Sequence, residues 1–533
     1  MACSKIFSGD LPELINEIIQ YFHHDYKTLY SCILINRLWC RLAIPLLWED
    51  PFSIKFPKNY HFIEIYLHNL NDDDKIKLNE YEYDNDLIPS NTLFNYPSFI
   101  QHLNTHNIIN SIINWEHSAR TSATKAQNFS KFIHKSLYQI FIENVVNLHS
   151  LEVVLHTSRQ YECLNLILQN PNFFRNIKNL KLEGLSVETL TGLSTPLSSN
   201  CNSISSLYFK LSYYFTNNDK HMIEKYLSQI INSQENLRRI LFNFYDFPLL
   251  SLKNSNCLNT LNTIIFYYVD FKNIIGLIEI FNQLNVLESI HIIFCKSLDT
   301  KFTSQIINIT KPFKLKSLIL NEILQIESLL LIIQKFGNNM EDFGFDVIKE
   351  KESLQLLESV ITYCCKIKFL YLPVVLNSQI INSFNLIKNI KQNLNYLLID
   401  ANNSHLSSII LQNLGQILPI KLEYLKLNLA INISDLETFL KNSQNTFIKI
   451  LVIRNSRIID GIEDIFHYIK EYIIKKKRIK YLAIAEATNR TCDDLFFLKD
   501  KVNELKLYDI QVLDYNSLDI DIGKFIYNNK YFY

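Results

Sequence analysis

Three consecutive segments of the chain repeat one pattern: IKFLYL at 367–372, LNYLLI at 394–399 and LEYLKL at 422–427. In each segment an apolar residue is followed by two variable positions, an apolar residue, one variable position and another apolar residue. Successive side chains of a β-strand point to opposite sides, so the alternation at the end of the pattern is typical of a short strand with one buried face. The pattern therefore predicts three short strands that follow one another at a nearly constant spacing.

The same pattern extends over most of the chain, at intervals that average about 27 residues. Its fourteen starting positions are Leu148, Ile177, Ile204, Leu237, Leu261, Leu287, Leu315, Met340, Ile367, Leu394, Leu422, Phe447, Ile479 and Val502. Segments between them, such as 222–230, 354–361 and 462–473, have apolar residues at helical spacing. One strand and one return helix per unit is the plan of a leucine-rich-repeat solenoid. An all-helical solenoid would need two helices per ~40 residues, which these intervals are too short to hold.

We therefore expect an α/β fold in which parallel strands line the concave face and helices cover the convex face. The array is irregular. An Asn or Cys eight positions after the start of a unit, which satisfies backbone groups at the turn, occurs only as Cys295, Asn402 and Asn455.

Composition divides the chain into three regions. We expect a small helical domain at 8–52, a helical and loop region at 53–147, and a solenoid of about fourteen repeats at 148–533. Within the middle region, 106–117 and 128–147 have helical periodicity, whereas the acidic stretch 72–86 is predicted to be an exposed loop.

Several classes of protein are disfavoured by composition and motifs. The 53 Lys and Arg balance 53 Asp and Glu, which argues against a nucleic-acid binder. The chain has no glycine-rich phosphate loop, nucleophile elbow or zinc-protease helix, and its ten cysteines form no CxxC pair. We expect no cofactor and no metal, and we expect a non-catalytic protein. With no signal peptide or membrane-spanning run, the free thiols favour the cytoplasm or the nucleus.

The N-terminal region reads DLPELINEIIQYFHHDYKTLYSCILINRLWCRLAIPLLW at 10–48. Asp10 and Glu13 have the spacing of a capping box at the start of a first helix. Asp25 can cap a second helix, which we expect to carry Leu29, Cys32, Ile33 and Trp39, and Pro45 and Trp48 close a third short segment.

These 39 residues resemble an F-box of the fungal type. The resemblance rests on Leu11–Pro12, on Cys-x-x-Ile-Asn-Arg-x-Trp, and on Pro-Leu-Leu-Trp, with the two tryptophans nine positions apart. It implies that this domain binds a Skp-type adaptor and, through it, a cullin and a RING subunit. The residues it implies for the adaptor surface or its supporting core are Leu11, Pro12, Leu14, Ile15, Ile18, Phe22, Leu29, Cys32 and Trp39.

An F-box followed by leucine-rich repeats implies the substrate-recognition subunit of an SCF-type (Skp–cullin–F-box) E3 ubiquitin ligase. Such a subunit works by protein–protein interaction and directs its target to proteasomal degradation. One alternative is a leucine-rich-repeat scaffold that acts outside a ligase. A regulator of a small GTPase is a further alternative, and the N-terminal motif argues against it.

The repeats also suggest where a target protein would bind. The third position of successive units holds Phe369, Tyr396, Tyr424, Lys449 and Tyr481, which would form an aromatic stripe on the concave face. Tyr and Phe give a large contact area at low entropic cost. We therefore expect Phe369, Tyr396, Tyr424 and Tyr481 to contact an unidentified protein substrate, although an aromatic residue here can also simply shield the sheet. The basic residues Arg238–Arg239 and Lys314–Lys316 are interpreted as solvated.

Overall fold

The computed structural model describes most of the chain. The described residues are 12–23, 25–54, 59–81, 83, 87–118, 126–144, 147–211, 217–243, 249–253, 255–272, 274–322, 325–346, 349–401, 403–456, 462–472, 478–487, 492–520, 522 and 525. The chain divides into two compact units. The first comprises Met1–Ile240 and Pro248–Leu261, and the second comprises Leu241–Phe247 and Asn262–Tyr533.

The first unit begins with helices and continues as alternating strands and helices. Its helices are α2 (Pro12–Tyr21), α3 (Tyr26–Ile33), α4 (Arg37–Leu47), α5 (Phe62–Leu67), α6 (Asp72–Glu80), α7 (Thr105–Ser118), α8 (Ala126–Asn144), α9 (Ser158–Leu168), α10 (Val187–Asn200) and α11 (Asn217–Asn232). Its strands are β1 (His102–Asn104), β2 (Ser150–Val154), β3 (Asn179–Leu185) and β4 (Ser206–Leu211), which pair in parallel in sequence order. The division between the units falls within β5 (Arg239–Asn243).

The second unit repeats strand and helix more regularly. Its parallel strands are β6 (Thr263–Tyr267), β7 (Ser289–Ile293), β8 (Lys314–Leu320), β9 (Asp342–Phe345), β10 (Phe369–Pro373), β11 (Tyr396–Ala401), β12 (Lys421–Leu429), β13 (Phe447–Asn455) and β14 (Tyr481–Ala487). The helices between them are α12 (Leu277–Gln283), α13 (Thr300–Ile307), α14 (Ile326–Phe336), α15 (Glu350–Tyr363), α16 (Asn377–Ile390), α17 (Ser404–Ile417), α18 (Ile433–Asn442) and α19 (Ile462–Tyr472). Two short strands end the sheet: β15 (Cys492–Asp494) pairs antiparallel with β14, and β16 (Gln511–Val512) pairs parallel with it.

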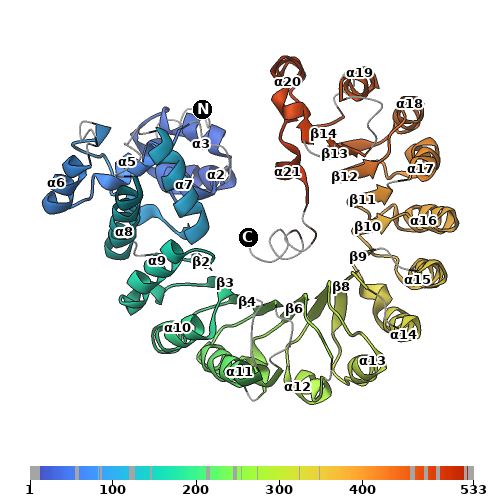
Figure 1. Cartoon of the computed structure of the whole chain (residues 1–533), viewed down its shortest axis with the longest axis horizontal. Helices are drawn as coiled ribbons and strands as arrows, with labels where there is room; N and C mark the ends of the chain where they lie inside the picture. Colours follow the sequence, from blue (N-terminus) through green and yellow to red (C-terminus); the bar gives the residue numbers. More distant parts are fainter. Residues whose placement is uncertain are drawn as a thin grey trace. The chain divides into compact units, whose positions relative to one another are not determined.

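The core of the second unit lies between its sheet and its helices. In Figure 1 the helices α12–α19 form an outer layer and the strands line the inner, concave face of the unit. Apolar residues of the repeat pattern, such as Leu370, Leu397 and Leu425, are fully buried together with helix residues such as Ile387 and Leu411. No single strand–helix pair could bury this surface alone, so each pair is stabilised by its neighbours. The predicted α/β solenoid with a parallel sheet is confirmed.

The predicted strands are confirmed at thirteen of the fourteen positions, each of which lies in a strand or two residues before one. The prediction is wrong for Val502, which lies in helix α20 (Lys499–Lys506). Leu505, three residues further on, is buried, so the two apolar residues share one face of this helix. Strand β1 was not predicted, because three residues are too few to display an alternating pattern.

The predicted helices at 106–117, 128–147, 222–230, 354–361 and 462–473 correspond to α7, α8, α11, α15 and α19. The predicted loop at 72–86 is wrong over its first half, which is helix α6. Asn71 caps this helix, its side chain accepting a hydrogen bond of 2.7 Å from the backbone N–H of Asp74. Asp72, Asp73 and Asp74 occupy the first turn, where negative charge is favoured by the helix dipole.

The predicted role of the Asn or Cys at the turn is confirmed at two positions. The Cys295 thiol donates to the carbonyl oxygen of Phe266, 3.4 Å away, and the buried Asn455 side chain accepts from the backbone N–H of Ile431 at 3.0 Å. The third predicted residue, Asn402, lies outside the described residues.

Candidate binding surfaces

Helices α2, α3 and α4 form a small bundle at the start of the first unit. Asp25 caps α3 as predicted, accepting from the backbone N–H of Thr28 at 3.1 Å. The chain then turns at Leu34–Ile35, and Asn36 caps α4 by accepting from the backbone N–H of Trp39 at 3.0 Å. Trp39 therefore lies in the third helix rather than in the second, where we predicted it, because a side-chain cap starts a new helix three residues before it.

The predicted adaptor residues divide into a buried set and a surface set. Ile15, Leu29, Cys32 and Trp39 are buried in the core of the bundle, together with Ile19, Ala43 and Leu46. These side chains hold the helices together. Because they are buried, they cannot contact a partner directly and can affect binding only by fixing the positions of the helices. Burial also raises the pKa of the Cys32 thiol, so the sulfur is a neutral packing group.

The surface set lies near the start of α2. Pro12 is exposed and Leu14 is 40% exposed, whereas Ile18 and Phe22 are half-buried against the core. Leu11 and the predicted cap Asp10 lie outside the described residues.

Sequence reasoning missed four further apolar residues on the surface of this bundle. They are Tyr21, Tyr30, Leu34 and Ile35, whose exposed fractions are 87%, 62%, 73% and 45%. The sequence contained a sign of this exposure. Leu34 and Ile35 lie after one amphipathic helix and directly before Asn36–Arg37, where the next helix begins, so they belong to the turn and not to the apolar face of either helix. Large apolar side chains in water on a bundle this small are typical of a surface that a partner covers.

The aromatic stripe of the second unit is brought together by strand register. Phe369 pairs with Tyr396, and Tyr396 pairs with Tyr424. Each successive pair of rings has centroids 6.3 Å apart, with the planes inclined by about 30°. Adjacent strands are about 4.8 Å apart, so rings at the same register position must contact one another.

The prediction is wrong for the fourth position of the stripe. Tyr424 pairs with Ile450 rather than with Lys449, and Ile450 in turn pairs with Tyr481. The unit begins at Ile448 instead of Phe447, and a shift of one residue moves a side chain to the other face of a strand. The pattern could not separate the two positions because Phe447 and Ile448 are both apolar.

The stripe is covered by residues from the end of the chain. Phe369 and Tyr424 are fully buried and Tyr396 is half-buried. The ring of Phe525 lies 5.0 Å from Phe369 and 4.5 Å from Tyr396, measured between centroids. The Tyr424 hydroxyl donates to the carbonyl oxygen of Leu518 at 3.0 Å and accepts from the N–H of Ile520 at 3.3 Å.

Charged groups lie beside the stripe on the same face. Lys426 forms an ion pair of 2.7 Å with Asp519, and Tyr371 donates a hydrogen bond of 3.1 Å to Asp400. Burial raises the pKa of Asp400, partly offset by the positive charge of Lys426. Burial alone would lower the pKa of Lys426, but Tyr515, Asp519 and Asp400 together raise it. Lys426 is therefore held in its charged form in a partly dry site.

A second polar cluster on this face contains His291, Ser317 and Asp342, which occupy the same register position on β7, β8 and β9. The Ser317 hydroxyl donates to Asp342 at 2.5 Å and lies 2.6 Å from Nδ1 of His291. Because Ser317 gives its only proton to the carboxylate, it must accept from His291, and the histidine is not its base. All three side chains are fully buried, so this cluster crosslinks strands instead of presenting a nucleophile.

Four lysines surround a hollow of about 580 Å³ at the edge of the sheet where β8, β9 and β10 begin. They are Lys314, Lys316, Lys366 and Lys368, and Glu341 pairs with Lys368 at 2.8 Å and with Lys316 at 3.5 Å. The C-terminal ends of α15 and α16 also reach this hollow. The lysines complement the partial negative charge of those helix ends, which agrees with their interpretation as solvated groups.

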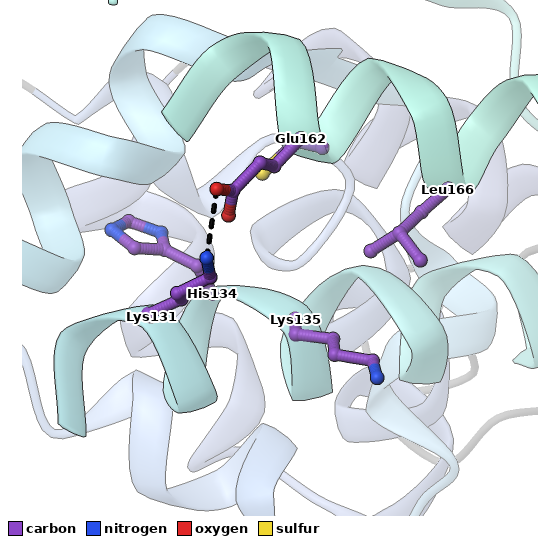
Figure 2. Close-up of a pocket in the computed structure, with 6 residues that line it drawn as sticks. Lys131, His134, Lys135, Glu162 and Leu166 are labelled. Atoms are coloured by element: carbon purple, nitrogen blue, oxygen red, sulfur yellow. Dashed lines mark hydrogen bonds and ion pairs between the residues drawn. The ribbon is translucent and has the colours of Figure 1, made fainter. Parts of the chain in front are cut away.

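A smaller hollow of about 130 Å³ lies between α8 and α9 in the first unit. Figure 2 shows Glu162 of α9 facing Lys131 of α8 across its edge, where they form an ion pair of 2.8 Å. Cys163 also lines the hollow, and burial raises the pKa of its thiol to about 12. A thiol with so high a pKa is a poor nucleophile, so this hollow offers packing space without reactive chemistry.

No protein-family model matches the chain, and no curated protein matches it. Within the described part of the chain, no group of three or more His, Cys, Asp or Glu residues could hold a metal ion. None of the described helices combines the length and the apolar character needed to cross a lipid bilayer.

Proposed function

We propose that this chain is the substrate-recognition subunit of an SCF-type E3 ubiquitin ligase. In this proposal the bundle of α2, α3 and α4 is an F-box, and the strand–helix units are leucine-rich repeats. The observation that carries the proposal is the division of apolar residues in the bundle. One set forms the core, and a second set, Leu14, Tyr21, Tyr30, Leu34 and Ile35, remains in water.

The exposed set favours a protein partner on energetic grounds. Removing apolar surface from water stabilises a complex by roughly 25 cal/mol per Å². A Skp-type adaptor that covered Leu14 and Leu34 would gain this energy without disturbing the core around Trp39. The concave face of the second unit would then hold the target protein, in the cytoplasm or the nucleus.

The proposed subunit needs no reactive group of its own. It would bring a lysine of the target close to a ubiquitin-charged enzyme and raise its effective concentration, which accelerates transfer by proximity.

The proposal is tested by affinity capture of the full chain from cells that express adaptor and cullin. Leu14→Asp combined with Leu34→Asp should remove both proteins from the capture. Leu507→Asp is a matched control, because Leu507 is 82% exposed and lies near the other end of the chain. Capture of adaptor without cullin would favour the alternative of a leucine-rich-repeat scaffold, and equal capture by all three chains would refute the proposed adaptor surface.

A further inference from the structure

The end of the chain lies on the concave face of the second unit. After β16, helix α21 (Tyr515–Leu518) runs beside β13 and β14 on the inner side of the sheet (Figure 1). We call the described residues 513–520, 522 and 525 the C-terminal segment. It contacts β10 through β14 by three separate kinds of interaction, each supplied by a different part of the segment.

The first contact is made by Tyr515, which is 5% exposed. Its ring lies 5.9 Å from the Lys426 ammonium and 5.7 Å from the Arg454 guanidinium, measured to the ring centroid. Its backbone N–H donates to the Asp494 carboxylate at 2.6 Å. Two cations beside one ring select an aromatic side chain at this position.

The second contact is the ion pair between Asp519 and Lys426, with atoms 2.7 Å apart. The Lys426 side chain is only 14% exposed, so this pair is shielded from water far more than a surface pair. Removing the carboxylate would leave a buried ammonium without its closest partner, which is unfavourable. Lys426 therefore selects an acidic residue four positions after the aromatic one.

The third contact combines backbone and ring recognition. The Tyr424 hydroxyl bonds the backbone on both sides of Asp519, at Leu518 and Ile520, which requires no particular side chain. Six residues after Asp519, Phe525 packs on the rings of Phe369 and Tyr396 and is 4% exposed. The segment is thus bound as a peptide is bound, with backbone hydrogen bonds and spaced side-chain pockets.

We infer that the concave face of β10–β14 is a peptide-binding surface whose ligands carry an acidic residue between two aromatic residues, and that the C-terminal segment occupies it as an internal ligand. This inference rests on the proposed function, because it names the class of target that the receptor would hold. A partner protein must present the same chemistry and displace the segment. Since a tethered segment has an effective concentration in the millimolar range, the free chain would bind partners weakly until the segment leaves.

The inference is tested with a fluorescent peptide of residues 513–527 and the full-length chain, by anisotropy. In the wild-type chain the tethered segment competes with the peptide. In the full chain carrying Asp519→Lys and Phe525→Ala, the segment is weakened, so the apparent Kd of the peptide should fall by at least about 10-fold. Phe525→Ala alone, which alters only the ring contact, should give a smaller change in the same direction.

Two controls separate displacement from damage to the fold. The full chain carrying Phe497→Ala loses an aromatic residue that is 70% exposed and should bind the peptide as the wild type does. Peptides carrying Asp519→Lys or Phe525→Ala should bind at least about 10-fold more weakly than the native peptide to the full chain that carries both substitutions. The inference would be overturned if the wild-type chain and both variants of the C-terminal segment bound the native peptide equally and had the same melting temperature. The anisotropy assay contains no adaptor, so its outcome does not depend on whether the N-terminal bundle binds an adaptor in the capture experiment.

Discussion

Gly344 shows how one residue permits the concave face to form. It lies in β9 directly beside Tyr371 of β10. A Cβ atom at Gly344 would lie 2.9 Å from the Tyr371 Cβ and 3.3 Å from its Cδ1, closer than ordinary van der Waals contact. Tyr371 in turn donates a hydrogen bond of 3.1 Å to Asp400, so the close approach at Gly344 places Tyr371 within reach of the next strand but one.

Gly344→Ala should therefore destabilise the second unit by about 1–3 kcal/mol, because the strand pair would have to separate to admit a methyl group. Equilibrium denaturation in urea measures this change. Gly192→Ala is the matched control. Gly192 lies in helix α10, where alanine is favoured over glycine by up to ~1 kcal/mol. A Cβ atom at Gly192 would meet only Cδ1 of Leu168, at 3.4 Å. A Gly344→Ala chain as stable as the wild type would contradict this account of the packing.

Asp50, which follows the N-terminal bundle, makes stability depend on pH. Burial, with a smaller contribution from the negative charges of Glu49 and Glu152, raises the pKa of its carboxyl from an ordinary value of 3.8 to about 7, although hydrogen bonds from Ser53 oppose this shift. Between about pH 4 and pH 7 the folded chain holds a proton that the unfolded chain has lost. The free energy of unfolding should therefore fall as the pH rises through this window.

Asp50→Asn should make this fall smaller by about 1–2 kcal/mol between pH 4 and pH 8, since the amide does not ionise. Glu49, whose pKa burial also raises to about 7, should keep part of the slope. Denaturant midpoints at several pH values check the prediction. Identical pH profiles for wild type and variant would contradict it.

The helices α2, α3 and α4 carry two sets of apolar residues, one buried in the core of the bundle and one exposed on its surface. Trp39 is 6% exposed within the core cluster, so Trp39→Ala should cost about 3–5 kcal/mol of stability. Leu14→Ala removes a side chain that is already 40% in water and should cost less than about 1 kcal/mol while still weakening adaptor capture. Circular dichroism during denaturation provides the stability readout, and equal losses for the two variants would contradict the division.

The strands were predictable because their pattern is local. An alternation of apolar and variable residues within six positions specifies one buried face, and thirteen repeats of it specify stacking. Register was predictable only to within a residue, as Ile450 shows, because neighbouring apolar residues make two alignments equivalent. Helix α6 was missed because its stability comes from capping and from acids at its first turn rather than from an apolar face.

At the scale of the whole molecule, the occupant of the concave face could not be predicted. Tyr424 and Leu518 are 94 residues apart in sequence, and the final residues carry no repeat pattern that would reveal their destination. Burial of Phe369 and Tyr424 is therefore a tertiary effect. The aromatic stripe, which we expected to be open, is therefore covered by residues from the end of the chain.

We propose that the N-terminal bundle of α2, α3 and α4 docks on a Skp-type adaptor. Its most direct test is titration calorimetry of the full-length chain with a purified Skp-type adaptor. We predict a one-to-one complex with a Kd near or below about 1 μM, and at least about 100-fold weaker binding for the chain carrying Leu14→Asp and Leu34→Asp. Absence of heat at tens of micromolar, or equal affinity for wild type and variant, would contradict it.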